Sequence, residues 1–420
     1  MGRAMDGVGC LNLLIFPESR FVFLPTCWLP IDYLFSGKSM SGMIRTLQWA
    51  GFLFSLVCYA SLLPAQSEVD AGSGHLQADG YTPDRKFAAY PSVIYTPETS
   101  FDLGITMVLL WHARYQGGQS RLNEVIVFPF YTLKKQYGLS TRHILVTREE
   151  QWFFYGRNRF QHFPLLYYGS GRQSDPAGAS VLTADYLISQ NRYLKRVAAN
   201  TFVGLQSNVQ WLANVSMEAQ AGGPLMPMPD GGEGNLTVGL GAAAVYDSRQ
   251  NLLNVREGLL VELGYLAFQP AWGSDFDFST WNWDIRGYQK AWRDNQVLAW
   301  QLAGQLTSGD APFNQLAAVG GESLLRGYYF GRFRDRQYVA GQVEMRWLPF
   351  SFSKRIGATA FLATGWVSDP VKELFSGPPI AAGGIGLRYL LFPKKDIFAR
   401  LDMGITPEGT GFYIYLGEAF

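Results

Sequence analysis

A small set of charged residues stands inside otherwise apolar runs, and their spacing gives them shared directions. Glu344 and Arg346 are two residues apart, and so are Arg400 and Asp402. Because side chains alternate between the two faces of a strand, residues two apart point the same way. These two pairs therefore favour ion-pair chemistry between charges that share one face of a strand.

The sequence lacks the usual signatures of catalysis. Gly169-Ser170-Gly171 does not have the G-x-S-x-G spacing of a nucleophile elbow, and no glycine-rich loop has the P-loop pattern. The histidines at 75, 112, 143 and 162 are scattered without the spacing of metal ligands. A formal net charge of +1 gives no footprint for nucleic acid. We expect no catalytic residue, no metal, no cofactor and no nucleic-acid partner.

The elements that position the charged residues have the pattern of strands. Runs of about ten residues alternate apolar with polar or small side chains, which is the period of a strand with two different faces. In the run 337–347, Val343 and Met345 point one way, whereas Glu344 and Arg346 point the other. Such runs predict sixteen strands, at 89–97, 100–112, 122–134, 138–147, 151–160, 178–190, 197–212, 235–247, 256–268, 277–286, 295–308, 337–347, 356–366, 381–391, 396–404 and 411–420.

These strands predict an all-β chain that folds as a closed antiparallel transmembrane β-barrel of about 16 strands. The charged face suits a polar lumen and the apolar face suits lipid. The sheet must close, because an open edge in lipid leaves backbone groups unsatisfied. An even strand number places the long stretches 163–177, 213–234 and 309–336 on one side, as outer loops. A soluble sandwich shows the same alternation within one strand, but the export signal favours the barrel. The aromatic-rich segment 411–420, which ends on Phe420, also favours it, because it fits the aromatic girdle at a membrane interface.

The N-terminal residues carry an export signal. Arg45 supplies a positive charge, residues 47–63 an apolar core, and Leu63-Pro64-Ala65 a small-residue exit for signal peptidase. The apolar core is short for a spanning helix, which favours cleavage over a retained anchor. We therefore interpret residues 1–65 as an N-terminal extension and signal peptide, with the true start at Met43 and cleavage near Ala65.

The polar residues 66–88 lack periodicity and are predicted to form a disordered periplasmic tail before the barrel at 89–420. The cysteines at 10, 27 and 58 all lie at or before the signal, so the mature chain has none. A chain without thiols is suited to an oxidising periplasm. We expect export to the bacterial outer membrane, with the mature protein beginning near Gln66.

The stretch 320–346, GGESLLRGYYFGRFRDRQYVAGQVEMR, resembles the BamA/TamA family of outer-membrane assembly barrels, the bacterial surface antigen family. The family's sixth outer loop carries a V-R-G-F/Y motif, matched here by Leu325-Arg326-Gly327-Tyr328, and its next strand carries an inward glutamate, matched by Glu344. Further matches are Tyr246-Asp247-Ser248-Arg249 with Gly258, the run 383–389 with Arg400-x-Asp402-x-Gly404, the run 95–99 that is similar to the opening of barrel-only members, and the C-terminal targeting signal at Phe412, Tyr415 and Phe420. The resemblance covers roughly residues 90–420.

This resemblance implies a function in outer-membrane protein assembly, insertion or translocation. It also implies that the outer loop is inserted into the lumen, where Arg326, Gly327 and Tyr328 form a latch with Glu344. The alternative is a solvated loop arginine that faces lipopolysaccharide phosphate. The implied partners are outer-membrane lipids and lipopolysaccharide, unfolded outer-membrane proteins, and a separate POTRA-bearing or periplasmic protein, since residues 66–88 are too few for POTRA repeats.

One departure from the family bears on the latch. The family's F-x-D-x-G motif reads Phe361-Leu362-Ala363-Thr364-Gly365 here, so Ala363 replaces an inward aspartate. We therefore expect Arg326 to lie near Ala363 and to depend mainly on Glu344.

Two alternatives stay open at this point. The lumen charges Arg346, Arg400 and Asp402 serve either gating and conduction or only a polar lining. The whole barrel is either an assembly protein or a passive pore or structural barrel that has lost assembly activity.

Overall fold

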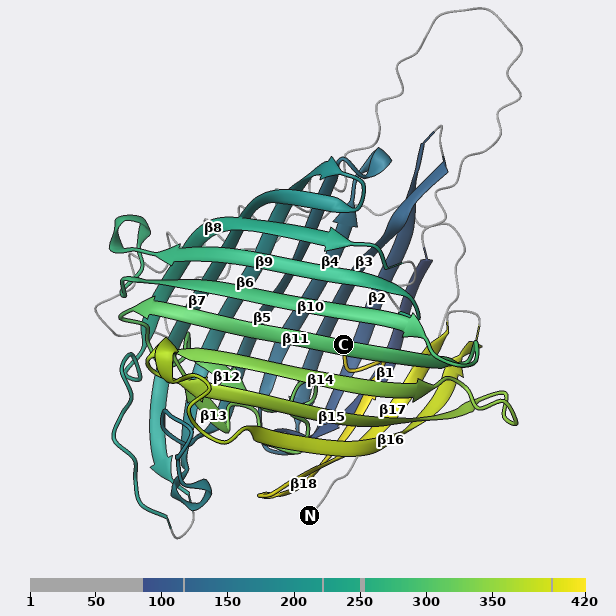
Figure 1. Ribbon diagram of the computed structural model, residues 1–420. Helices are drawn as coiled ribbons and strands as arrows, with labels where there is room; N and C mark the ends of the chain where they lie inside the picture. Colours follow the sequence, from purple (N-terminus) through teal and green to yellow (C-terminus); the bar gives the residue numbers. More distant parts are fainter. Residues whose placement is uncertain (1–85, 116–117, 221–222, 250–253, 394–395) are drawn as a thin grey trace, which may run out of the picture. The chain divides into compact units, whose positions relative to one another are not determined.

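The computed structural model describes residues 86–420 apart from 116–117, 221–222, 250–253 and 394–395 (Figure 1). Its wall strands are β1 Lys86–Thr96, β2 Ser100–Tyr115, β3 Gly118–Thr132, β4 Tyr137–Val146, β5 Trp152–Tyr167, β6 Ser180–Ala198, β7 Thr201–Ala219, β8 Asn235–Asp247, β9 Gly258–Phe268, β10 Phe278–Lys290, β11 Gln296–Gly309, β14 Gln337–Trp347, β15 Ile356–Ser368, β16 Ile380–Phe392, β17 Ile397–Thr406 and β18 Gly409–Leu416. A hairpin of β12 Ala317–Val319 and β13 Phe333–Asp335 lies in the loop between β11 and β14. Four single 3-10 turns, η1 Arg148–Glu150, η2 Pro176–Gly178, η3 Pro270–Trp272 and η4 Val371–Glu373, lie between strands.

The sheet closes on itself. Each wall strand pairs antiparallel with its two neighbours, in the order β1-β18-β17-β16-β15-β14-β11-β10 and on down to β2. Closure pairs the backbone groups that lipid cannot satisfy. The β12–β13 hairpin forms a separate two-stranded sheet, so it does not interrupt the wall. The predicted closed antiparallel barrel of sixteen strands is confirmed.

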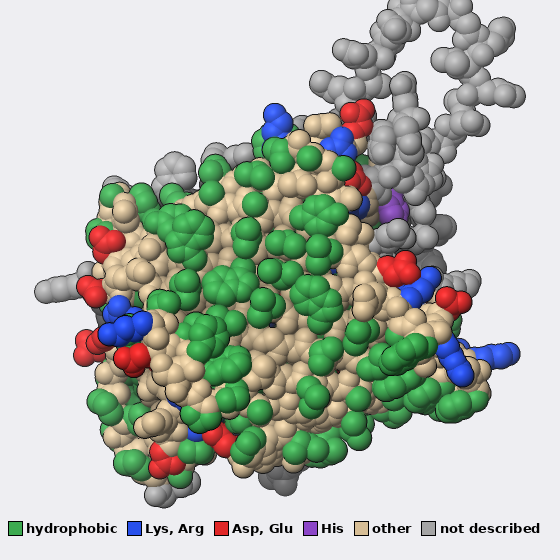
Figure 2. All heavy atoms as spheres, viewed as in Figure 1, with side chains coloured by type: hydrophobic (Ala, Val, Ile, Leu, Met, Phe, Trp, Pro, Cys, Tyr) green, Lys and Arg blue, Asp and Glu red, His purple; other side chains and the backbone are tan. Residues whose placement is uncertain are grey.

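The wall has the two faces that the alternation predicts. On β14, Glu344 and Arg346 are fully buried, whereas Val343 between them is 41% exposed. On β15, Leu362 is 67% exposed, whereas its neighbour Phe361 is buried. Figure 2 shows the outer face over β8 to β11 and β14, where hydrophobic side chains cover the middle and charged side chains gather near the strand ends. The exposed row faces lipid and the buried row lines the lumen.

The lumen is less uniformly polar than the sequence pattern suggests. Near the periplasmic end, Phe202 and Leu194 pack together on the inner face. Near the outer end, Leu212 and Phe313 belong to one inner cluster and Phe268 to another. Polar and charged residues therefore occupy the middle of the lumen, while apolar groups narrow both ends.

Some strands are longer than predicted. β5 runs to Tyr167 and β7 to Ala219, so the loops expected at 163–177 and 213–234 are shorter than predicted. β6 likewise extends beyond the expected 178–190. A strand needs only about 9–11 residues to cross the hydrocarbon, so these strands continue beyond it by backbone pairing. At the outer ends of β5 and β7 the inner side is apolar, because Leu165, Val215 and Met217 pack around Phe313 of the outer loop.

The two ends of the barrel segment also differ from the prediction. β1 begins at Lys86, so residues 86–88 are strand and not tail. β18 ends at Leu416, so the predicted strand 411–420 is too long. The proposed extension and signal peptide at 1–65, and the rest of the tail, lie outside the described residues. Within the part of the chain that is described, no helix has the length and hydropathy needed to cross a membrane.

Candidate functional site

The loop between β11 and β14 enters the barrel. Residues 320–332, between the two strands of its hairpin, carry Arg326 to a fully buried position on the lumen side. Gly327 has a φ of +114°, and a Cβ there would lie 2.6 Å from Thr406 Cγ2 on β17. A Cβ on Gly404 of β17 would collide with the Arg326 carbonyl. Glycine at both positions therefore lets the loop backbone touch the wall, and this contact sets the depth of Arg326.

Arg326 binds carboxylates from two different strands. Its Nη2 donates to Glu344 Oε2 on β14, and its Nη1 donates to Asp402 Oδ2 on β17 at 2.6 Å. The guanidinium also lies over the ring of Phe361 on β15, 3.5 Å from the ring centroid. All three ionic side chains are fully buried. A planar fork that spans two acids and stacks on a ring suits arginine and not lysine.

The two acids are shared with three further arginines. Arg346 donates through Nε to Glu344 Oε1 at 2.7 Å. Arg388 donates through Nη1 to Asp402 Oδ1 at 2.5 Å, and Arg400 donates to Asp402 Oδ2 at 3.0 Å. Each carboxylate therefore has at least two cationic partners, which offsets its desolvation.

A third acid joins from beyond the end of β18. Glu418 accepts from Arg388 Nε at 2.9 Å and lies 3.8 Å from Arg346 Nε. We call the following set the charge cluster: Arg326, Glu344, Arg346, Arg388, Arg400, Asp402 and Glu418. Each of its charged groups contacts an opposite charge, so the cluster is suited to fastening segments together and not to reacting with a substrate.

The structure brings together the residues that the sequence singles out. Arg326, Glu344, Arg346, Arg400 and Asp402 all meet in one buried cluster. Arg400 and Asp402 form the expected same-face pair.

Tyr328, the last latch residue, is also buried, and its hydroxyl donates to the Ala381 carbonyl at 3.2 Å. Its ring meets Phe333 edge-on, with the centroids 5.0 Å apart. The tyrosine thus anchors the loop to β16 while Arg326 anchors it to β14 and β17.

The expectation that Arg326 depends mainly on Glu344 is wrong. Ala363 packs with Leu325, the residue before Arg326, while Phe361, two residues earlier on the same face, lies under the guanidinium. Asp402 supplies the second carboxylate, so Arg326 does not depend on Glu344 alone. The second carboxylate at Arg326 thus comes from β17 and not from β15.

Two members of the charge cluster were not among the predicted site residues. Arg388 lies directly opposite Arg400 in the β16–β17 register. Its even spacing from Gly384 and Gly386 is the sequence pattern that could have indicated a lumen-facing side chain. Glu418 follows the last strand, where alternation ends, and the sequence holds no comparable signal for it.

The same loop also reaches both sides of the barrel's closing seam. The backbone N–H of Phe330 donates to Glu98 Oε1 at 2.6 Å, in the turn between β1 and β2. Arg332 donates from Nε and Nη2 to the Glu408 carboxylate at 2.7 and 2.8 Å, in the turn between β17 and β18. Burial raises the pKa of the Glu98 carboxyl above its usual value. We call Glu98, Phe330, Arg332 and Glu408 the outer clasp.

The segment after β18 turns into the lumen, contrary to the expectation of a terminal aromatic in the membrane girdle. Phe420 is buried among Val255, Tyr288 and Val297 at the periplasmic end. The Arg346 guanidinium lies 4.9 Å from its ring centroid, and Arg346 Nη2 donates to its carbonyl at 3.2 Å.

The other two residues of the predicted targeting signal face opposite sides of β18. Phe412 is 47% exposed on the lipid face, which is the position of a girdle aromatic. Tyr415 faces the lumen, where the Arg400 guanidinium lies 5.0 Å from its ring centroid.

We predict that Phe420→Ala lowers the free energy of unfolding by about 3 kcal/mol, because a buried aromatic ring is replaced by a cavity. Lower outer-membrane levels should accompany this loss, since the family's targeting signal is altered as well. Thermal unfolding of the folded band in detergent and immunoblots of membrane fractions measure the two effects. Phe352→Ala, at a ring that is 83% exposed, is the matched control, and equal behaviour of the two variants would contradict the assigned packing.

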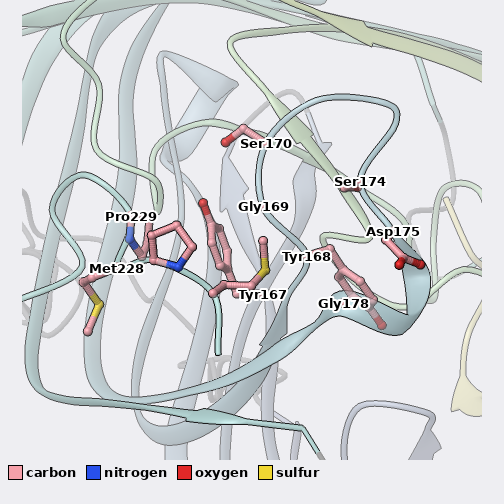
Figure 3. A pocket seen from close by; sticks show the side chains of 11 residues that line it. Tyr167, Tyr168, Gly169, Ser170, Ser174, Asp175, Gly178, Met228 and Pro229 are labelled. Atoms are coloured by element: carbon pink, nitrogen blue, oxygen red, sulfur yellow. The ribbon is translucent and has the colours of Figure 1, made fainter. Parts of the chain in front are cut away.

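A cavity of about 350 Å³ lies apart from the charge cluster, between the outer loops 168–179 and 220–234. Figure 3 shows Tyr167, Met228 and Pro229 on one side of it and Asp175 on another. Asp175 Oδ1 accepts from the Ala177 N–H at 2.9 Å and so caps the η2 turn. This lining offers no convergent charged groups, and we do not assign the cavity to the site. Among residues 86–420 as described, no group of three or more His, Cys, Asp or Glu is arranged to hold a metal ion.

The fold and the buried loop define a class: a transmembrane β-barrel whose outer loop is fastened inside the lumen by an arginine. The chain matches the Omp85 superfamily domain over residues 166–391, and it belongs to that superfamily. Relatives in this superfamily reside in the bacterial outer membrane.

Solved structures show the same fold at low identity. BamA from Haemophilus ducreyi lacking POTRA domains 1–3 is similar over 80% of this chain and 70% of that chain, with 13% sequence identity and a TM-score of 0.51. CdiB from Escherichia coli is similar over 78% of this chain and 62% of that chain, with 12% identity and a TM-score of 0.52. This chain therefore spans less than two thirds of CdiB. No curated protein matches it.

Proposed function

We propose that this chain is an outer-membrane barrel that takes part in the assembly, insertion or translocation of outer-membrane proteins by opening between β1 and β18. Superfamily membership and the BamA-like fold support this class of function. The loop motif and the strand glutamate of the family are both present, and the motif's Arg326 is buried in ionic contact with Glu344.

The weak seam is the observation that carries the proposal. β1 and β18 are in register at a single residue pair, Tyr95 opposite Ile414. In contrast, every residue of β1 is paired with β2, and every residue of β18 is paired with β17. A short ladder has few backbone hydrogen bonds to break, and the two edges it releases are templates for an incoming strand.

Side-chain contacts at the two ends of the seam hold β1 and β18 together in addition to the short β1–β18 ladder. The outer clasp ties the β1–β2 turn and the β17–β18 turn to one loop. At the periplasmic end, Glu418 ties the segment after β18 to Arg388 on β16. In this mechanism an incoming strand pairs with β1 while β18 stays attached to β17, and opening requires release of the Glu98 contact.

A reconstituted folding reaction tests the proposal. Urea-unfolded outer-membrane barrel is added to lipid vesicles that contain the purified chain, and folded product is followed by its shift on unheated gels. Faster folding than in protein-free vesicles, or in vesicles that hold an equal amount of a porin, is expected. Equal rates in all three, with a purified POTRA-bearing protein present or absent, would contradict it.

The alternative of a passive pore has less support from the lumen. Gln315 of the outer loop donates to Thr237 on β8 at 2.7 Å, and Asn314 donates to Gln210 on β7 at 3.2 Å. The loop therefore contacts the inner wall at β7 and β8 on one side and the β1–β2 turn on another. Ion conductance across planar bilayers separates the two functions, and a large constant conductance would favour the pore.

The partners follow from the proposed function. We propose that the apolar wall takes outer-membrane lipid and that the outer loops face lipopolysaccharide. The substrates are unfolded outer-membrane proteins, and a separate POTRA-bearing or periplasmic protein delivers them.

A further inference from the structure

Polar side chains gather on the lipid-facing side of the wall, far from the charge cluster. On β4, β5 and β6 the outward row includes Thr141, Asn158 and Ser189, which lie directly opposite one another in the register. His143 on β4 and Asn191 on β6 belong to the next row. We call these five residues the polar patch.

The outward direction of the patch follows from its neighbours. Leu139, Phe160 and Leu187 form the row directly toward the outer end, and Leu139 and Phe160 are 42% and 46% exposed. Arg192, one residue from Asn191 on β6, instead points into the lumen, where it donates to Glu262 on β9 at 2.7 Å. The patch is therefore on the face that meets lipid.

The patch members hydrogen-bond to one another. Ser189 Oγ donates to Asn158 Oδ1 at 2.7 Å, and Asn191 Nδ2 donates to Ser189 Oγ at 2.9 Å. Asn158 Nδ2 donates to Thr141 Oγ1 at 3.3 Å. The nitrogens of the His143 ring have no hydrogen-bond partner among the described residues. Each asparagine amide has two donors and an acceptor with two lone pairs, so the patch keeps unused capacity on its lipid side.

The position of the patch along the strands makes its unused hydrogen-bonding groups unfavourable in free energy. Ser189 lies at the middle of β6, 9 residues from each end, and Asn158 lies 6 residues from the start of β5 and 9 from its end. Apolar rows flank the patch, with Phe160 and Leu187 toward the outer end and Phe154 and Tyr193 toward the periplasm. Polar groups inside hydrocarbon are expensive and tend to mark functional sites.

The patch is also shaped for close approach. Gly156 lies between His143 and Asn191, and a Cβ there would lie 2.8 Å from the His143 ring, so the missing side chain lets both neighbours fold over the strand. Ser189 and Thr141 are small as well. Small residues let transmembrane surfaces approach until polar side chains can bond across the contact.

We propose that the polar patch is an interface through which two copies of this chain pair within the membrane. Only a second transmembrane protein places polar groups at mid-depth, and it must match donors with acceptors without net charge. The patch is self-complementary in this respect, because Asn, Ser, Thr and neutral His each donate and accept. A two-fold axis through the patch brings the same surface to both copies, as an isologous contact requires.

Energy transfer between donor- and acceptor-labelled copies in lipid vesicles, followed over a range of protein-to-lipid ratios, tests the pairing. The wild-type chain should dimerise, and Asn158→Leu/Ser189→Ala/Asn191→Leu should weaken the dimer about tenfold or more. Leu302→Ala on β11, at a lipid-facing side chain that is 40% exposed, should leave pairing unchanged. The triple variant removes polar groups from a lipid face, so the barrel should fold, which its mobility on unheated gels checks.

A cross-link tests the same contact in a variant with one small change. The three cysteines of the sequence all lie at or before residue 58, so Ser189→Cys is unique in the mature chain that we predict. A short membrane-permeable bismaleimide should join Ser189→Cys copies and leave Leu302→Cys copies unlinked. A wild-type chain that stays monomeric at every ratio, or a dimer that the triple variant retains, would overturn the proposal.

Discussion

Removing one carboxylate from the charge cluster should destabilise the barrel far more than removing Arg326. We expect Asp402→Ala and Glu344→Ala each to lower the free energy of unfolding by about 3–5 kcal/mol, the usual cost of leaving buried charges without partners. Arg326→Ala should cost the barrel less, although it releases the inserted loop.

The number of partners that each group leaves behind gives this order. Arg326, Arg388 and Arg400 all bind Asp402, and Arg326 and Arg346 both bind Glu344. Loss of either acid therefore takes a partner from two or three buried arginines. Without Arg326, Glu344 still binds Arg346, and Asp402 still binds Arg388 and Arg400. Without Asp402, three arginines lose a partner at once.

The measurements are the unfolding temperature of the folded band in detergent and the rate at which protease cuts residues 320–332. Glu257→Gln is the matched control, because its partner Lys290 is 46% exposed and the pair is 3.2 Å apart at the surface. Exposed pairs contribute about 0–1 kcal/mol, so that variant should unfold like the wild type. An Arg326→Ala loss as large as that of Asp402→Ala would contradict this explanation from the number of lost partners.

The alternation of side chains was sufficient to predict sixteen strands, because lipid and lumen impose opposite demands on successive residues. It worked best where both demands apply, as in β8, whose bounds match the prediction at 235–247. It failed at the outer parts of β5 and β7, where the inner face is apolar because it packs around Phe313 of the outer loop. The expected contrast between a polar lumen and an apolar outer face does not hold there.

The charge cluster was predictable in part. Glu344, Arg346, Arg400 and Asp402 were expected to point inward because of their spacing, and a motif indicated the pairing of Arg326 with Glu344. The contact between Arg326 and Asp402 could not be predicted, since it depends on how the loop crosses from β14 to β17. Local periodicity holds no information on such distances between strands.

The aromatic positions near the end of the chain show the same limit. The segment 411–420 was expected at an aromatic girdle, and within it Phe412 lies on the lipid face. The chain leaves the strand after Leu416, however, and Phe420 packs under Arg346. The cluster that receives it comes from β10 and β11 and the loop before β9, which the sequence near residue 420 cannot indicate.

A disulfide across the seam should abolish the proposed assembly activity. Tyr95→Cys with Ile414→Cys places two thiols on directly opposed residues of β1 and β18. Opposed residues of antiparallel strands have Cα atoms about 4.5–5.5 Å apart, which a disulfide can bridge. The covalent bond holds the one pair that the ladder has, so an incoming strand finds no free edge.

Leu298→Cys with Met345→Cys is the matched control, because these residues are also opposed and lipid-facing but lie on β11 and β14, away from the seam. Folding of an unfolded barrel into vesicles is measured with each oxidised protein and again after reduction. We expect the oxidised seam variant to match protein-free vesicles and to regain wild-type rates on reduction, while the control is active throughout. Full activity with the seam disulfide formed would contradict opening between β1 and β18.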